Sequence, residues 1–224
     1  MDGKIKEYKS LSRLVYEQLR NDIYYGVLLP GSKVVVDRLS REYGVSKIPI
    51  REAIQKLAAE GLVEVAPHRG AVVTVYSPRD VEEIYAVRSV LEPYATRLAA
   101  EKMSDHELQV LEELYQQMAE ATKKKDYKKI PQINHEFHRN LYKFSQNRWL
   151  YKVLMDLWGR TRRSNAAFAF VREHAERMFG EHQALMKALK ARDAEAAEKV
   201  ARTHVLSAKR GAIEYAEKWG GSER

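Results

Sequence analysis

The stretch that most constrains this chain of 224 residues runs from Gly44 to Leu57, with the sequence GVSKIPIREAIQKL. Its apolar residues recur every three or four positions, which predicts a helix with one buried face. The apolar residues of this face are Ile50, Ile54, Leu57 and Ala58. Lys47 and Arg51 lie four residues apart on another face, and Pro49 falls in the first turn, where its missing N–H costs little. A short helix with a basic face, entered from a glycine turn, suits insertion into the major groove of DNA.

The residues before this helix predict two more helices. One is expected from about Leu11 to Tyr25, and Leu29-Pro30-Gly31 is typical of a turn, because proline fixes φ and glycine accepts conformations that other residues avoid. Val34–Val36 reads as a short extended run. Asp37 is expected to cap a second helix that ends before Gly44, and Ser46 is expected to cap the third.

The residues after this helix predict a β-hairpin. Two β-branched runs, Leu62–Val65 and Ala71–Val75, flank the turn Pro67–Gly70, a pattern typical of paired strands. Three helices followed by a hairpin form a winged helix-turn-helix. At the tip of the wing, Arg69 stands beside Gly70, which allows a close approach to a phosphate or to the minor groove.

The charge balance agrees with a nucleic-acid partner. The whole chain has a formal net charge of +8, which is compatible with such a partner but weak evidence alone. Between Arg38 and Lys56, five basic residues outnumber two acidic ones. The plain alternative is a small helical domain with a solvated basic face. That alternative does not explain why a glycine turn, a capped basic helix and an Arg-Gly hairpin occur in this order.

Several short motifs in residues 10–76 resemble the DNA-binding domain of GntR-type bacterial transcription factors. The motifs are Pro30-Gly31, Gly44-Val45-Ser46, Pro49-Ile50-Arg51-Glu52-Ala53, Glu60-Gly61-Leu62-Val63 and Pro67-His68-Arg69-Gly70. The resemblance implies that Ser46, Lys47 and Arg51 face operator DNA and that the wing reaches an adjacent groove. The full set of candidate DNA contacts is Arg38, Ser46, Lys47, Ile48, Arg51, His68, Arg69 and Gly70.

Two of these positions depart from the family pattern. The family usually has arginine where this chain has Lys47 and a hydroxyl residue where it has Ile48. Lysine cannot make the rigid two-pronged contact that arginine makes to guanine, and Ile48 offers only an apolar contact, such as one to a thymine methyl group. The common operator core of the family is therefore not expected here.

From Ser77-Pro78 onward the pattern is helical throughout. The predicted domain boundary lies here, with a winged helix-turn-helix at residues 1–77 and an all-helical domain at residues 78–224. The second domain is expected to be a bundle of about six helices that binds an effector and dimerises, so the fold class is mostly α. The helices are expected near residues 79–102, 105–124, 126–146, 148–164, 168–190 and 193–217.

Composition excludes several classes of protein. The chain has no cysteine, which rules out disulfides, thiolate chemistry and cysteine-based zinc sites. No run approaches 18 apolar residues, so no membrane contact is expected. The first ten residues lack the apolar core of a secretory signal. A cytoplasmic protein is the expectation.

Histidines carry the chemistry of the second half. Asn134 and His138 lie four residues apart and share one helical face. His182 and His204 lie 22 residues apart, with a turn near Asp193 midway, which predicts that they face each other across two antiparallel helices. Three imidazoles and an amide oxygen could converge on one divalent ion such as Zn, Ni, Co or Fe. The alternative is that these are separate histidines satisfied within a helical core.

The second half also resembles the all-helical effector domain of the FadR branch of GntR regulators, often called FCD. The motifs are Arg88-Ser-Val-Leu-Glu92, Asn134-His-Glu-Phe-His138, Glu181-His182, Asp193 before an alanine-rich helix, and His204. In many members an aspartate and three histidines hold a metal at the floor of a ligand cavity. The resemblance implies that Asn134, His138, His182 and His204 hold a metal here, with Zn or Ni expected. Asparagine at the aspartate position implies weaker metal binding and a more positive site, which favours an anionic effector.

Two further residues are candidates for effector binding. His135 is turned about 100° from Asn134 around the helix, so it is expected at the edge of the pocket. Arg88 either pairs with Glu92 or clamps an effector carboxylate with its planar fork, and the sequence leaves both open.

These features predict a ligand-responsive transcription regulator that is not an enzyme. It is expected to bind double-stranded, inverted-repeat operator DNA as a homodimeric repressor and to respond to a small acidic metabolite near the metal. One alternative keeps the DNA-binding role with a purely structural metal or none. The other is a three-histidine metalloenzyme, for which Glu181 is a conceivable base.

Overall fold

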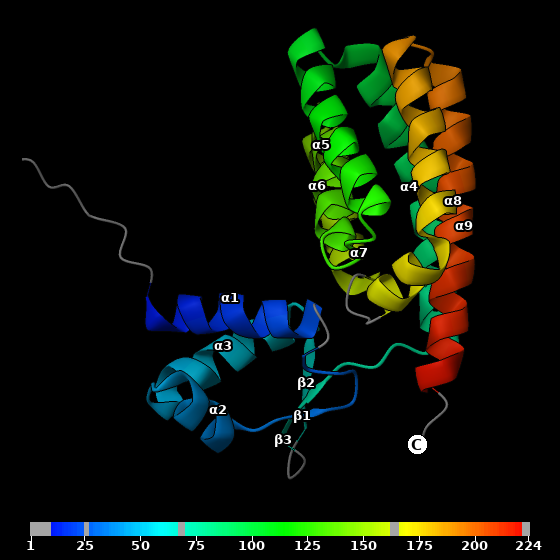
Figure 1. The fold of residues 1–224 in the computed structure, drawn as a ribbon. Helices are drawn as coiled ribbons and strands as arrows, with labels where there is room; N and C mark the ends of the chain where they lie inside the picture. The colour runs from blue at the N-terminus through cyan, green and yellow to red at the C-terminus, as the bar shows by residue number, and fades with distance from the viewer. Residues whose placement is uncertain (1–9, 25–26, 67–69, 162–165, 221–224) are drawn as a thin grey trace, which may run out of the picture. The chain divides into compact units, whose positions relative to one another are not determined.

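The computed structural model describes residues 10–24, 27–66, 70–161 and 166–220. These residues form two compact units, which meet in the sequence between Val75 and Tyr76 (Figure 1). The described chain is dominated by helices, and the three short strands all lie in the first unit. The predicted fold class, a winged helix-turn-helix followed by an all-α bundle, is confirmed.

The first unit has three helices around one apolar core. They are α1 (Leu11–Tyr24), α2 (Val36–Tyr43) and α3 (Lys47–Ala59). Helix α1 packs against α3, with Leu19, Ile50 and Leu57 fully buried between them. Leu11 and Leu14 lie on α1 but are exposed, so the apolar contribution of this helix to the core starts at Val15.

The ends of α2 differ in part from the prediction. Gly44 ends the helix in the left-handed conformation at φ 64°, which glycine adopts without the steric cost of a Cβ. At the other end, α2 begins at Val36 with Val35 as its N-cap and without a side-chain cap hydrogen bond. The prediction that Asp37 caps this helix is therefore wrong, because Asp37 already lies within the first helical turn.

The wing is a three-stranded antiparallel sheet. The hairpin strands β2 (Val63–Ala66) and β3 (Gly70–Val73) pair with Val63 opposite Val73. A third strand, β1 (Lys33–Val34), pairs with the other edge of β3, with Val34 opposite Ala71. The strand order is therefore β1-β3-β2. A strand of two residues is too short to show a periodic pattern, which is why the sequence predicts an extended run there but not its pairing.

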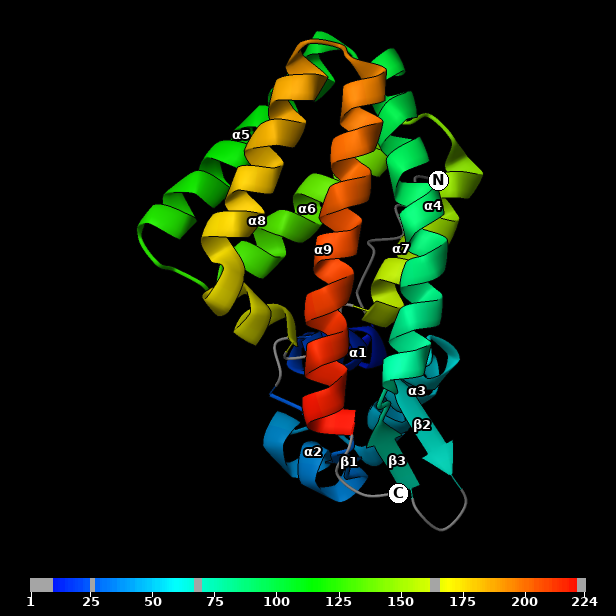
Figure 2. The ribbon, with the colours of Figure 1, turned by 90° about the vertical axis from the view of Figure 1, so that its right-hand side faces the viewer.

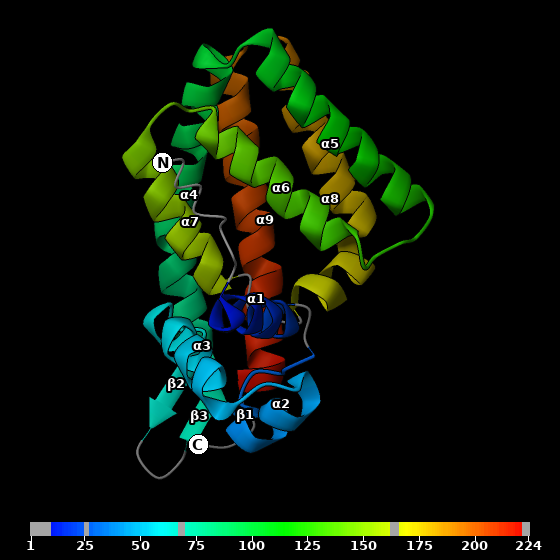
Figure 3. The ribbon, with the colours of Figure 1, turned by 90° about the vertical axis from the view of Figure 1, so that its left-hand side faces the viewer.

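The second unit is an all-helical bundle. Helix α9 packs against both α4 and α8 (Figure 2), and α6 packs against α5 and α7 (Figure 3). Helix α4 starts with a capping box, in which the Ser77 hydroxyl accepts a hydrogen bond from the backbone N–H of Asp80. That cap and Pro78 explain why the helical pattern starts abruptly after the wing. The helices are α4 (Pro78–Lys102), α5 (Asp105–Lys123), α6 (Ile130–Lys143), α7 (Arg148–Thr161), α8 (Ala166–Lys190) and α9 (Ala194–Gly220).

The bundle buries its apolar side chains in one large core. Phe137, Leu141 and Tyr142 of α6 are among its most deeply buried members. Within the described helices, none is both long and apolar enough to span a membrane. Buried polar residues also occur in the bundle, and they include two histidines, His138 and His182.

Candidate functional site

Helix α3 presents a polar face to solvent, as its sequence period predicts. Its buried residues are Ile50, Ala53, Ile54 and Leu57. Lys47 and Arg51 are exposed, and the Ile48 side chain, at 68% exposure, is the least covered of the large apolar residues on this helix. Ser46 is the N-cap residue by position, but its side chain makes no cap hydrogen bond. The four predicted contacts on this helix therefore lie on accessible positions.

The other predicted DNA contacts lie on α2 and the wing. Arg38 is exposed on α2 and pairs with Glu42, with 3.5 Å between Arg38 Nε and Glu42 Oε1. Gly70 opens strand β3 with a φ of 74°. His68 and Arg69 lie outside the residues that the structure describes.

A groove of about 430 Å³ lies between α3 and the sheet. Arg51 and Gln55 line it from the helix, and Lys33 and Gly70 line it from the strands. Lys33 is a cation that the sequence reading missed, because the extended run predicted at Val34–Val36 did not indicate its pairing with β3. Two cations in one groove suit a phosphate group, which binds lysine and arginine through charge-assisted hydrogen bonds.

The second site is a buried cluster of histidines in the helical unit. His138 comes from α6, His182 from α8 and His204 from α9. Their ligand atoms all lie within 4.8 Å of one another, and the ring centroids of His182 and His204 are 4.8 Å apart. His182 and His204 thus lie close together, as the antiparallel arrangement predicts. His138, 66 positions before His204 in the sequence, joins them from a third helix.

Hydrogen bonds fix which nitrogen of two of these rings carries a proton. His182 Nδ1 lies 2.7 Å from the backbone carbonyl of Met178, and His204 Nδ1 lies 2.7 Å from Glu181 Oε2. A carbonyl and a carboxylate can only accept, so both Nδ1 atoms donate. In the neutral form of either ring, Nε2 therefore carries the lone pair.

A buried tyrosine does the same for the third ring. The Tyr142 hydroxyl donates to Glu92 Oε2 at 2.6 Å and lies 3.2 Å from His138 Nδ1. Because its only proton is given to Glu92, the hydroxyl accepts from His138 Nδ1. In the neutral His138 ring, Nε2 is therefore the nitrogen that keeps a lone pair. Outer partners of this kind orient histidine ligands in metal sites.

Electrostatics keep two of these histidines neutral. Burial, and then the charge of His204, lower the pKa of His182 to about 3. Burial and the neighbouring histidines hold the pKa of His138 well below its usual value. Metal binding needs deprotonated ligands, so both rings are ready to bind a cation at neutral pH without losing a proton.

The spacing of two of the lone pairs, those of His138 and His182, fits one metal ion. His138 Nε2 and His182 Nε2 are 3.1 Å apart, and neither carries a proton to place between them. Two nitrogens bound to the same zinc ion at about 2.0–2.1 Å lie roughly 3 Å apart. A cation between the two atoms turns a repulsive contact into a favourable one, so the donor set suits a divalent metal.

Asn134 offers an oxygen on the same helix as His138. It lies one helical turn before His138 on α6. Its Oδ1 atom is buried and accepts no hydrogen bond from any residue that the structure describes. An orphaned buried acceptor is costly, and a metal ion would satisfy it, so Asn134 also fits the predicted ligand set.

The two candidate effector residues have different surroundings. Arg88 and Glu92 form the buried ion pair that was one of the two readings of Arg88. The Arg88 guanidinium lies over the rings of Tyr85 and Trp158, 4.3 and 4.7 Å from their centroids. His135 is half-buried, with its ring 6.0 Å from that of Trp158, and lies outside the group of three clustered histidines.

Glu92 joins Arg88 to the histidine cluster. Its Oε1 atom accepts from Arg88 Nε and, at 2.8 Å, from Trp158 Nε1, while its Oε2 atom accepts from Tyr142. The sequence reading missed Tyr142, although its place four residues after His138 on one helical face is a signal for it. Arg88, Glu92, Tyr142 and His138 thus form one continuous buried network.

Replacing Tyr142 with phenylalanine should lower metal affinity by roughly 10- to 100-fold, as loss of an outer partner of a metal-binding histidine does. His138 Nδ1 and Glu92 Oε2 would each lose a partner, so the free energy of unfolding should also fall by about 1–3 kcal/mol. Titration against a competing chelator measures the first effect and urea denaturation the second. Tyr115→Phe is the matched control, because Tyr115 stacks on Phe179 away from this network. Equal metal affinity in both variants would contradict the role of Tyr142.

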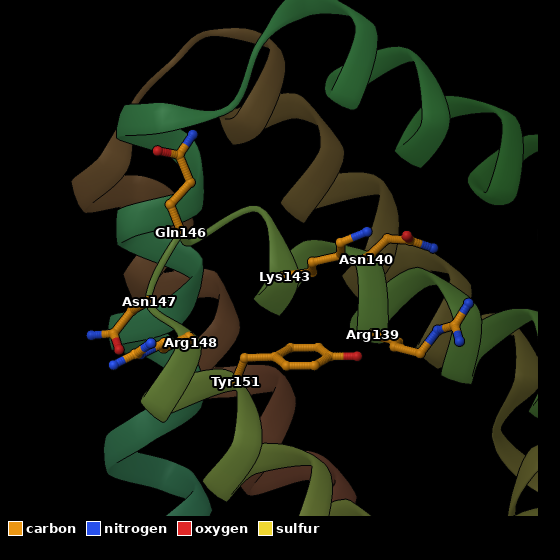
Figure 4. Close-up of a pocket in the computed structure, with 7 residues that line it drawn as sticks. All are labelled: Arg139, Asn140, Lys143, Gln146, Asn147, Arg148 and Tyr151. Carbon is orange, nitrogen blue, oxygen red and sulfur yellow. The ribbon is translucent and has the colours of Figure 1, made fainter.

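A separate pocket of about 420 Å³ lies at the turn between α6 and α7 (Figure 4). Tyr151 reaches from α7 toward the side chains of α6, and Arg139 is already paired with Glu136 at 2.6 Å. None of the clustered histidines lines this pocket. The lining residues are Arg139, Asn140, Lys143, Gln146, Asn147, Arg148 and Tyr151.

Comparison with known proteins matches both units to described families. Residues 11–73 match the family described as "Bacterial regulatory proteins, gntR family", and residues 83–207 match the FCD domain. The chain is 31% identical over 199 residues to the HTH-type transcriptional regulator McbR of Escherichia coli, covering 86% of this chain and 88% of McbR. It is also 31% identical to the uncharacterized regulator YdhC of Bacillus subtilis, over 86% of this chain and 84% of YdhC.

A solved structure shares the fold. The structure of E. coli McbR/YncC superposes with a TM-score of 0.77 at 27% identity, covering 92% of this chain and 98% of that one. These relatives are transcription regulators and not enzymes. In this chain Glu181, the conceivable base of a metalloenzyme, accepts a hydrogen bond from His204 Nδ1. The chain belongs to the GntR family of bacterial transcription regulators and carries the FCD effector domain.

Proposed function

We propose that this regulator is a homodimeric repressor that binds an inverted-repeat operator and is released by a small acidic metabolite. Residues 1–77 serve as the DNA-binding domain, and residues 78–224 serve as the effector-binding and dimerisation domain. The protein acts in the cytoplasm, where bacterial DNA lies. An effector releases DNA only if it binds the two arrangements of the dimer unequally.

The main support for the proposed effector site is the 3.1 Å distance between His138 Nε2 and His182 Nε2. We infer that His138, His182 and His204, with Asn134, hold a divalent metal, with Zn or Ni favoured by imidazole ligands. The bound ion supplies a Lewis acid for a carboxylate oxygen of the effector. A neutral asparagine in the ligand set leaves the site more positive than an aspartate would, which favours an anion.

Two residues complete the proposed effector site. Arg88 is buried in its pair with Glu92, so in this proposal it binds the effector by exchanging the Glu92 carboxylate for that of the effector. His135 lies at the edge of the same site, next to Trp158. Neither residue is required for metal binding in this proposal.

The DNA-binding face combines α3, α2 and the wing. Ser46, Lys47, Ile48 and Arg51 on or beside α3 contact base edges, and Arg38 contacts the backbone. The wing residues His68, Arg69 and Gly70 reach the adjacent groove. Phosphate contacts make such binding fall steeply with rising salt concentration.

Exposed apolar side chains support the dimer. Val87, Val90 and Tyr94 recur at three- and four-residue spacing on α4, and Trp149 and Val153 do so on α7. Helices α4 and α7 pack against each other. Val90 and Trp149 are 61% and 62% exposed, and exposed apolar groups in such number mark an interaction surface. A second copy of the chain covers this surface in our proposal.

Replacing Val90 with aspartate should convert the dimer to a monomer at micromolar concentration, because two unpaired carboxylates would then be buried at the two-fold interface. Sedimentation equilibrium measures the mass. Leu14→Asp is the control, since Leu14 is similarly exposed on α1. A Val90→Asp protein that remains dimeric would exclude this surface as the interface.

One experiment separates the proposal from its alternatives. Purified protein is analysed for metal, then stripped with chelator, and operator binding is measured with and without Zn, Ni and a panel of small carboxylic acids. We expect bound metal and acid-dependent release of DNA only in the metal-loaded protein. Metal that raises the melting temperature without an acid response would indicate a structural ion. Absence of metal, with no thermal shift on adding Zn or Ni, would overturn the metal site.

A further inference from the structure

One carboxylate stands within the basic face of the DNA-binding unit. Asp37, in the first turn of α2, pairs with Lys47, the first residue of α3, with 2.7 Å between Asp37 Oδ1 and Lys47 Nζ. Both side chains are more than half exposed. The hydrogen bond from Lys47, and then the charges of Lys47, Arg41 and Arg51, lower the pKa of Asp37, so it remains ionised at neutral pH. The helix-turn-helix therefore presents a fixed negative charge beside its recognition helix.

Stability does not explain this carboxylate. Asp37 makes no cap hydrogen bond, because Val35 is the N-cap residue of α2. An exposed ion pair contributes little to the free energy of unfolding. Near the phosphate backbone a carboxylate opposes binding to any sequence. An aspartate at this place thus weakens general DNA affinity and gives little stability in return.

Base chemistry gives the carboxylate a role. In the major groove, cytosine presents an N4 amino donor, which a carboxylate accepts, and guanine presents the O6 and N7 acceptors, which an ammonium contacts. Asp37 supplies the acceptor for cytosine and Lys47 the donor for guanine, with 2.7 Å between Asp37 Oδ1 and Lys47 Nζ. The ion pair also restrains Lys47, a flexible side chain that lacks the rigid fork of arginine. Together the two side chains match a G·C base pair better than either does alone.

We propose that Asp37 and Lys47 act as one base-reading unit, in which the carboxylate accepts from a cytosine amino group while the ammonium contacts guanine. The proposal rests on the proposed function, because it requires α3 to lie in the major groove. It predicts a strong G·C preference at one position of each half-site. It also predicts that Asp37 lowers affinity for non-specific DNA, where no amino group meets the carboxylate.

The test compares two variants that remove the same charge from the same helix. Asp37→Asn removes the carboxylate of the reading unit, and Glu42→Gln removes the exposed carboxylate that pairs with Arg38. DNA is selected from a random pool by wild type and by each variant, and the base preference at every position is measured. We expect Asp37→Asn to reduce the preference at one position per half-site by roughly tenfold or more and Glu42→Gln to leave it unchanged.

A double variant tests whether the pair acts as a unit. The preference lost in Asp37→Asn/Lys47→Met should equal that lost in Lys47→Met alone, because residues that act together are not additive. Unchanged preference in Asp37→Asn, or the same loss in Glu42→Gln, would overturn the reading unit. If the wild type selects no inverted repeat at all, the proposed function itself fails, whereas selection of the same sequence by wild type and Asp37→Asn refutes only this inference.

Discussion

Replacing Arg51 with alanine should weaken operator binding by roughly 30-fold or more, without changing the fold or the oligomeric state. A good arginine contact to guanine contributes about 1–3 kcal/mol, and a homodimer makes two of them. Arg51 is exposed on α3, while Ile50, Ile54 and Leu57 hold the helix to the core. Fluorescence anisotropy with a labelled operator measures the affinity, and circular dichroism checks the fold.

Arg13→Ala is the matched control for this prediction. Arg13 is an exposed arginine of the same unit, on α1, and pairs with Glu17 at 3.2 Å. The substitution removes the same charge away from the proposed DNA face, so affinity should change by less than about threefold. Wild-type affinity and an unchanged footprint for Arg51→Ala would show that α3 is not the recognition helix.

Replacing His138 with glutamine should lower metal affinity by roughly 100-fold or more, because one of three convergent imidazoles is lost. Metal at 100 times its dissociation constant stabilises a protein by about 2.7 kcal/mol. That stabilisation should be present in the wild type and nearly absent in His138→Gln at the same metal concentration. Chelator competition and thermal denaturation with added Zn or Ni measure the two effects.

His106→Gln is the control for this second prediction. His106 is exposed at the start of α5, so its loss should leave metal affinity and thermal stabilisation unchanged. If His138→Gln still binds one metal ion with wild-type affinity, the cluster of His138, His182 and His204 is not the metal site.

Periodicity was sufficient to predict the framework of the fold. The apolar spacing in α3 and the cap at Ser77 before α4 are local signals, so the helices and the end of the wing follow from the sequence. The pairing of β1 with β3 does not, because Lys33 and Val34 form a strand only through contact with residues that lie about 40 positions later. Which apolar residues of α1 are buried likewise depends on how this helix packs against α3.

The candidate metal site was predictable only where local spacing along the sequence determines it. His182 and His204 lie at equal distances from one turn, so their meeting follows from the sequence. The roles of Tyr142 and Glu92 do not, because they depend on how α4 and α6 pack. Asp37 was assigned as a helix cap because aspartate often is one. Its partner, Lys47, is the first residue of α3, so the pair depends on how α2 and α3 pack together.

The most direct test of the account is selection of DNA fragments by the purified, metal-loaded protein, followed by sequencing. We expect an inverted repeat whose half-sites are centred about one helical turn, or a multiple of it, apart. The same selection with Arg51→Ala should enrich no sequence. Enrichment of an unsymmetrical site, or of the same inverted repeat by Arg51→Ala, would contradict a homodimer that reads its operator through α3.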